Sequence, residues 1–176
     1  MKYFFGTALL IASVTLVFAA TKTGQSESAT IGGKKITINY SSPAVNGRVG
    51  KLFGKDGQIG TDGTYPVWRA GANEATVLHT DADLDLGGLT VPKGDYTLYV
   101  DLTNPGAWTL IVNKSTGQWG TEYPAAKDLG HVKMATTKTP ALVEQLKYTL
   151  TSTGGNKGKL TLAWENVSAS VDFTVK

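Results

Sequence analysis

The chain of 176 residues contains no cysteine, which excludes both a disulfide framework and an N-terminal lipid-modified cysteine. It also lacks any long segment with the 3.6-residue apolar period of an amphipathic helix. Its net charge is only +3, and no cluster of basic residues is interleaved with aromatics. Because nucleic-acid binding needs a concentrated basic face, we expect no nucleic-acid partner. An apolar core alone must hold such a fold.

Arginine is scarce, with two residues against fifteen lysines. Lysine suffices wherever a solvated positive charge is needed. Arg48 and Arg69 are therefore expected where a planar guanidinium holds a carboxylate or phosphate through parallel hydrogen bonds. Glu74, five residues after Arg69, is the nearest candidate partner in the sequence.

The N-terminus has the organisation of a secretory signal peptide. Lys2 supplies the positive charge, residues 3–17 are almost uncharged and apolar, and Ala19 ends a small-residue cleavage motif. The apolar stretch is shorter than the roughly 20 residues that cross a bilayer comfortably. We predict that residues 1–19 are a signal peptide cleaved after Ala19, with cleavage after Ala20 or a retained anchor as alternatives. The protein would then be periplasmic or extracellular, without a stable membrane anchor.

The remaining chain fits one domain, over residues 31–176, after a polar and flexible lead over residues 20–30. Apolar and polar residues alternate with a period of two, and glycine-rich turns separate the alternating runs. About nine strands are predicted, near residues 35–40, 75–80, 83–86, 96–101, 108–112, 131–135, 142–150, 159–164 and 171–175. Short helical turns are possible at 46–53 and 125–129. The pattern predicts an all-β, antiparallel, jelly-roll-like β-sandwich, with a closed β-barrel as the alternative.

One long irregular segment interrupts this pattern. Residues 41–69 are glycine-rich and lack periodicity, and they carry Arg48 near one end and Arg69 at the other. Loops of this length inside a compact domain are usually functional or disordered. We expect an ordered loop that crosses one end of the sandwich and brings the two arginines together.

Four segments, in order, give the chain a family resemblance: residues 40–48, 67–76, 87–98 and 108–120. The second of these, Val-Trp-Arg-Ala-Gly-Ala-Asn-Glu-Ala-Thr, is the most specific. The chain resembles the bacterial family known as domain of unknown function 2911, over residues 31–175. This resemblance implies an exported, β-rich domain, and it implies no established activity.

The candidate site is built around Arg48, Arg69 and Glu74. The two guanidinium groups could clamp an anionic ligand while Glu74 orients one of them, or Arg69 and Glu74 could form a structural ion pair that fixes the loop. Asn73 is expected to hold a turn through its side-chain amide. Three aromatic residues are further candidates for the ligand site: Tyr40, Trp68 and Trp119. Trp68 and Trp119 lie beside loop-like segments and could stack on a ligand or serve as core. Trp108 and Trp164 lie on alternating strands and are expected in the core.

Metal sites and cofactors are not expected. The only histidines, His79 and His131, are far apart, and a zinc site needs more ligands. His79 falls within a predicted strand, where it would be a cross-strand neighbour. Asp81, Asp83 and Asp85 resemble the start of a calcium loop, but the sixth position is a leucine and the later bidentate glutamate is missing.

The sequence favours a non-enzymatic domain that binds a small anionic or carbohydrate ligand at the end of the sandwich. Two alternatives stay open. One is a hydrolase-type enzyme that uses Glu74 with Arg69 or Arg48 as an electrostatic stabiliser. The other is an envelope module that binds a protein partner through strand edges or loops.

Overall fold

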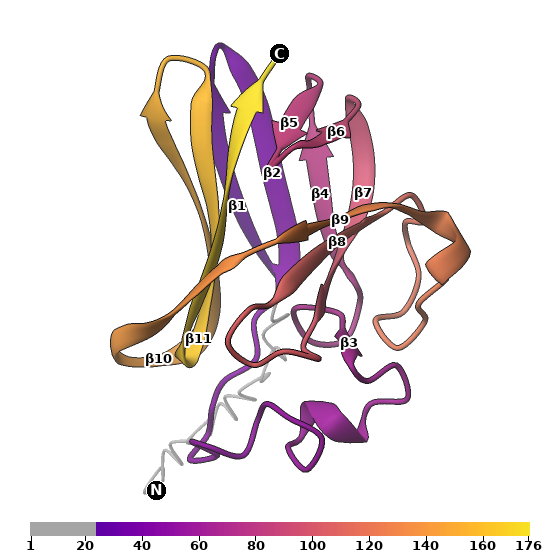
Figure 1. Ribbon diagram of the computed structural model, residues 1–176, viewed down its shortest axis with the longest axis vertical. Helices are drawn as coiled ribbons and strands as arrows, with labels where there is room; N and C mark the ends of the chain where they lie inside the picture. Colours follow the sequence, from indigo (N-terminus) through magenta and orange to yellow (C-terminus); the bar gives the residue numbers. More distant parts are fainter. Residues whose placement is uncertain (1–23) are drawn as a thin grey trace, which may run out of the picture.

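The computed structural model describes residues 24–176, which form a sandwich of two antiparallel sheets (Figure 1). Seven strands make the larger sheet: β1 (Gly24–Ile31), β2 (Lys34–Ser41), β3 (Val67–Trp68), β4 (Thr76–Thr80), β7 (Gly94–Asp101), β8 (Thr109–Asn113) and β9 (Asp128–Lys133). Four make the smaller sheet: β5 (Leu84–Leu86), β6 (Leu89–Val91), β10 (Ala135–Gly154) and β11 (Lys157–Val175). The described residues close no barrel, so the prediction of an all-β sandwich is confirmed.

Glycine pairs form the tight turns of the sandwich. Gly32 and Gly33 join β1 to β2, and Gly87 and Gly88 join β5 to β6. All four have positive φ, between 56° and 93°, a region that glycine enters without the steric cost that a Cβ brings. The hairpin turns that the sequence predicted at these pairs are therefore present.

The core lies between the sheets, and an aromatic cluster closes one end of it. Trp68 is 1% exposed and stacks on Trp164, with ring centroids 5.8 Å apart. Phe53 packs against Trp68 and Trp108 at 5.8 and 4.9 Å. Trp108 and Trp164 are 3% and 5% exposed, which confirms them as core residues. The cluster fills the space where the two sheets meet the long loop.

The long irregular segment, residues 42–66, lies at the end of the sandwich next to β3 (Figure 1). The smaller sheet holds it through hydrogen bonds to its backbone: Val45 N donates to the Glu144 carbonyl oxygen at 2.8 Å, and Gly50 N donates to the Glu165 side-chain carboxylate. Leu52 and Ile59, both in this segment, are buried in the core. The loop is thus an ordered cap, as the sequence predicted.

Two predictions about the strands differ from the structure. Residues 24–30, expected within a flexible lead, instead pair with β2 along the whole of β1. Most side chains of β1 are exposed, so the strand lacks the alternation that identifies strands in a sequence. Eleven strands form rather than nine, because β1, β3 and β6 are added and one long strand, β11, replaces two shorter ones.

The predicted helical turns are correct in one of two places. Residues 125–129 include the 3-10 helix η2 (Ala125–Lys127). In the described loop, residues 46–53 contain no helix, and the 3-10 turn η1 (Ile59–Thr61) lies further along. The predicted signal peptide, residues 1–19, lies outside the described residues. Within them, no helix is both long and apolar enough to cross a membrane.

His79 is a cross-strand neighbour, as predicted, and it gives a first testable expectation. Its Nδ1 lies 2.7 Å from Asp95 on β7, and its Nε2 lies 3.0 Å from Asp81. The hydrogen bond to Asp95, and next the one to Asp81, raise the pKa of His79 above its ordinary 6.5. A raised folded-state pKa stabilises the fold fully below the unfolded pKa, and this stabilisation disappears as the pH rises through the folded pKa.

NMR titration of the imidazole protons should therefore give His79 a midpoint above 6.5. Asp95→Asn should lower this midpoint more than Asp81→Asn, because the bond to Asp95 is the larger cause of the shift. In the wild type, the free energy of unfolding should fall as the pH rises through the pKa of folded His79, and His79→Gln should remove this fall. A wild-type midpoint at or below 6.5 would contradict the ion-pair geometry.

Candidate functional site

The Trp-Arg-x-Gly-x-Asn-Glu-x-Thr motif forms a hydrogen-bonded turn between β3 and β4. Trp68 Nε1 donates to the Gly71 carbonyl oxygen at 3.3 Å, and Thr76 Oγ1 donates to the Ala70 carbonyl oxygen at 3.1 Å. The buried hydroxyl of Tyr148, on the opposite sheet, donates to the same Ala70 oxygen at 3.0 Å. These bonds hold the backbone of the motif in place and leave the Arg and Glu side chains for other contacts.

The structure brings Arg48 and Arg69 to one cavity. It has a volume of about 110 Å³ and lies where the loop over residues 42–66 meets the motif turn. The residues that define its chemistry are Arg48, Gln58, Asp62, Trp68, Arg69 and Trp164. We call it the arginine cavity. Two guanidinium groups and one carboxylate line it, so its local charge is positive.

Arg48 is the structural member of the pair. Its Nε donates to the Val45 carbonyl oxygen at 2.8 Å, and its Nη2 donates to the Ala44 carbonyl oxygen at 2.6 Å. Its Nη1 donates to Gln58 Oε1. All three guanidinium nitrogens therefore hold the loop, and each is satisfied within the protein.

Arg69 is far less satisfied than Arg48. Its Nη1 lies 3.2 Å from Asp62 Oδ2, an ion pair whose geometry falls short of a hydrogen bond, and the side chains are 17% and 21% exposed. Both Nε and Nη1 are buried without a hydrogen-bond partner in the described protein. The indole Nε1 of Trp164, another residue of the cavity, is also buried and unpaired. Buried polar groups normally form hydrogen bonds, so these three donors without one make the arginine cavity the candidate site.

The expected pairing of Arg69 with Glu74 is wrong, because the partner of Arg69 is Asp62. Glu74 is exposed and forms a β-bridge with Trp119. It lines two other cavities, of about 350 and 200 Å³, and neither of these includes an arginine. The predicted constellation is thus divided between two places.

The other candidate residues are divided in the same way. Trp68 is buried and borders the arginine cavity, whereas Trp119 is 51% exposed beside Glu74. Tyr40 packs its ring 4.8 Å from that of Tyr148, and burial raises the pKa of its hydroxyl. Asn73 adopts a left-handed conformation with φ 58°, and its carbonyl oxygen accepts from Gly120 N at 2.9 Å. Asn73 therefore connects the motif turn to Gly120 through its backbone, and not through the side-chain amide as predicted.

Sequence reasoning missed Asp62 and Gln58, which lie in an irregular loop whose path no periodicity reveals. The one available signal was that Asp62 is an opposite charge seven residues before Arg69. Among residues 24–176, no group of three or more histidine or acidic side chains is arranged to hold a metal ion. His131 instead lies 2.8 Å from Asp128 on the same strand.

Comparison with known proteins gives one match. Residues 22–173 match the family described as "Protein of unknown function (DUF2911)". No curated protein and no solved structure matches the chain. The matched range includes both arginines and the whole motif turn, so the chain belongs to the DUF2911 family.

Proposed function

We propose that the protein binds the anionic group of a small molecule in the arginine cavity, through the Arg69 guanidinium. The observation that carries the proposal is the set of buried donors without a hydrogen bond at this cavity: Arg69 Nε, Trp164 Nε1 and Arg69 Nη1, the last of which has only its ion pair with Asp62. A guanidinium presents its N–H groups in a planar fork that matches the oxygens of a carboxylate or phosphate. Either group would supply the missing acceptors.

The size of the cavity restricts the ligand. At roughly 30 Å³ per liquid water molecule, a volume of about 110 Å³ holds three to four waters or one oxyanion group. Asp62 neutralises only one of the two guanidinium charges, which leaves a net attraction for an anion. The remainder of a larger ligand would have to lie outside the cavity.

The proposal can be tested by thermal unfolding at constant ionic strength with formate, acetate, inorganic phosphate or sulfate added. A ligand that binds only the folded state raises its stability by about 2.7 kcal/mol at 100 times its Kd. We expect at least one of these anions to raise the midpoint of the wild type. If formate or acetate raises the midpoint, the site binds a carboxylate; if phosphate or sulfate does so, it binds a tetrahedral oxyanion.

Arg69→Lys should abolish this rise, because lysine keeps the charge but loses the planar fork. Lys55→Gln is the matched control: it removes an exposed charge from the same loop and should leave the rise intact. Two results would contradict the proposal. In one, no anion stabilises the wild type; in the other, Arg69→Lys responds as strongly as the wild type does.

The hydrolase alternative required a carboxylate beside the arginines. Glu74 does not fill that place, and the carboxylate that does, Asp62, is engaged with Arg69. The geometry therefore supports binding at this cavity better than catalysis by the predicted residues.

A further inference from the structure

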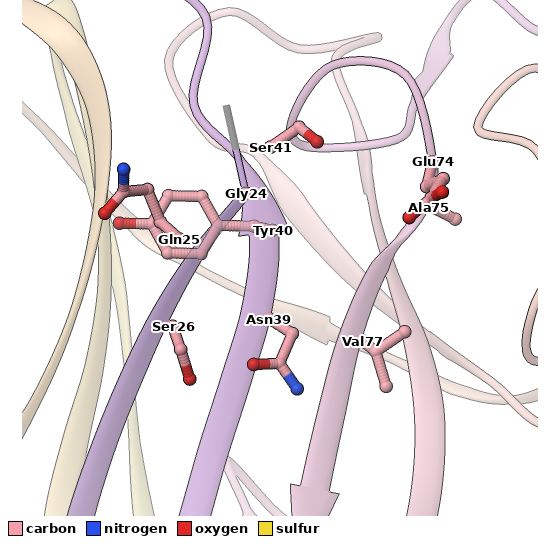
Figure 2. A pocket seen from close by; sticks show the side chains of 9 residues that line it. All are labelled: Gly24, Gln25, Ser26, Asn39, Tyr40, Ser41, Glu74, Ala75 and Val77. Atoms are coloured by element: carbon pink, nitrogen blue, oxygen red, sulfur yellow. The ribbon is translucent and has the colours of Figure 1, made fainter. Parts of the chain in front are cut away.

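A second site lies on the outer face of the larger sheet, separate from the arginine cavity. Two cavities there, of about 350 and 200 Å³, share the lining residues Glu74, Ala75 and Val77. The larger crosses strands β1, β2 and β4, and Figure 2 shows Ser26, Asn39 and Val77 on these three strands, with Glu74 near the start of β4. The smaller continues to Trp119. We call the two together the outer groove.

The outer groove has the composition of a site for a neutral, hydroxyl-rich ligand. Glu74 is the one charged side chain that lines it among the described residues. Amide and hydroxyl side chains supply its other polar groups: Ser26, Asn39, Ser41 and Gln118. Gln25 and Tyr40 also border the groove, but their side chains point toward the other sheet (Figure 2). A single negative charge disfavours anions, whereas a carboxylate accepts strong hydrogen bonds from hydroxyl groups.

Gln118 offers an acceptor at the wall of this groove. Its Nε2 donates to the Tyr99 hydroxyl at 2.9 Å and to Thr97 Oγ1 at 3.2 Å. Those two hydroxyls donate their own hydrogens elsewhere, to the carbonyl oxygens of Glu122 at 2.6 Å and Ser115 at 2.7 Å. Only the amide nitrogen can therefore face them, which fixes the orientation of the side chain. Gln118 Oε1 is left buried without a donor.

Trp119 supplies the apolar surface. It is 51% exposed, while the other three tryptophans of the chain are buried in the core. Its β-bridge to Glu74 places the two residues directly opposite each other, so their side chains leave the backbone on the same face. An aromatic ring next to a few polar groups in a concave site is the usual composition of a small-molecule site.

We infer that the outer groove binds a neutral saccharide. The apolar face of one sugar ring packs on Trp119, its hydroxyls donate to the Glu74 carboxylate, and Gln118 Oε1 accepts from a further hydroxyl. The larger cavity, with Asn39 and Ser26, receives the adjoining sugar unit. This inference does not depend on anion binding in the arginine cavity, since the lining residues of the two sites do not overlap.

Titration of the purified protein with neutral di- and trisaccharides of glucose, galactose, mannose and N-acetylglucosamine tests the inference. Calorimetry measures affinity, and acrylamide quenching reports on Trp119 as the exposed tryptophan. We expect at least one saccharide to bind and to protect Trp119 from the quencher. Trp119→Ala should weaken binding about tenfold or more through lost ring contact, and Glu74→Ala about tenfold or more through lost charged hydrogen bonds.

Two controls separate this site from the rest of the molecule. Trp119→Tyr keeps an aromatic ring and should retain most of the affinity. Asp56→Asn removes an exposed carboxylate outside the groove and should bind as the wild type does. The inference is overturned if no neutral saccharide binds the folded protein, or if binding survives in both Trp119→Ala and Glu74→Ala. Binding of acidic sugars alone, lost in Arg69→Lys, would also overturn it.

Discussion

Replacing Trp68 by alanine should destabilise the fold by about 3–5 kcal/mol, the range measured for truncation of a large buried aromatic side chain. The ring is 1% exposed and contacts Phe53, Trp108 and Trp164, so its removal leaves a cavity at the centre of the aromatic cluster. The bond from its indole nitrogen to Gly71 is lost as well. Urea unfolding, followed by circular dichroism, measures the change as a lower midpoint.

Trp119→Ala is the matched control, because it removes the same side chain from an exposed position. Its effect on stability should stay within about 0.5 kcal/mol, as is usual for surface substitutions. Equal losses in the two variants, or a loss below about 1 kcal/mol in Trp68→Ala, would show that the cluster does not close the end of the sandwich. The contrast also establishes that Trp119→Ala is folded when its saccharide binding is measured.

Much of this fold could be predicted from alternation, since a strand with one buried face repeats every two residues. In β4, Thr76, Leu78 and Thr80 are buried and the residues between them are not. The same rule fails at β1 and in the first half of β10, where most side chains are exposed and backbone pairing alone makes the strand. Pairing of this kind depends on a neighbouring strand, which a single sequence does not reveal.

The site was harder to predict than the strands. That Arg48 and Arg69 would meet followed from their positions at the two ends of one long loop. The ion pair of Arg69 with Asp62 depended on the path of the backbone. The position of Glu74 in another groove depended on it as well. Asn73, with φ 58°, lies immediately before Glu74, and left-handed residues of this kind redirect the chain without any regular period. Proximity in sequence was therefore a poor guide to the ion pair.

The side chain of Arg69 packs closely against Gly120, and this close approach leads to the second large expected effect. A Cβ added to Gly120 would lie 2.5 Å from the Asn73 carbonyl oxygen and closer still to Arg69 Cδ. Real Cβ atoms do not approach backbone oxygens this closely, so the structure must shift. Displacement of the Arg69 side chain relieves one of these clashes, and relief of the other moves the Asn73 oxygen and weakens its bond to Gly120 N.

Gly120→Ala should therefore displace Arg69 from the arginine cavity, destabilise the fold by about 1–3 kcal/mol as overpacking does, and abolish stabilisation by anions. Gly106→Ala is the control, since the nearest atom to its added Cβ is Asn104 Oδ1, at an ordinary 3.7 Å. Thermal unfolding with and without the anion measures both effects at once. The prediction is contradicted if Gly120→Ala unfolds at the wild-type midpoint and still responds to the anion. The position of the Arg69 side chain would then not depend on a glycine at residue 120. If stability falls but the anion response survives, Arg69 retains its place and the backbone alone has adjusted.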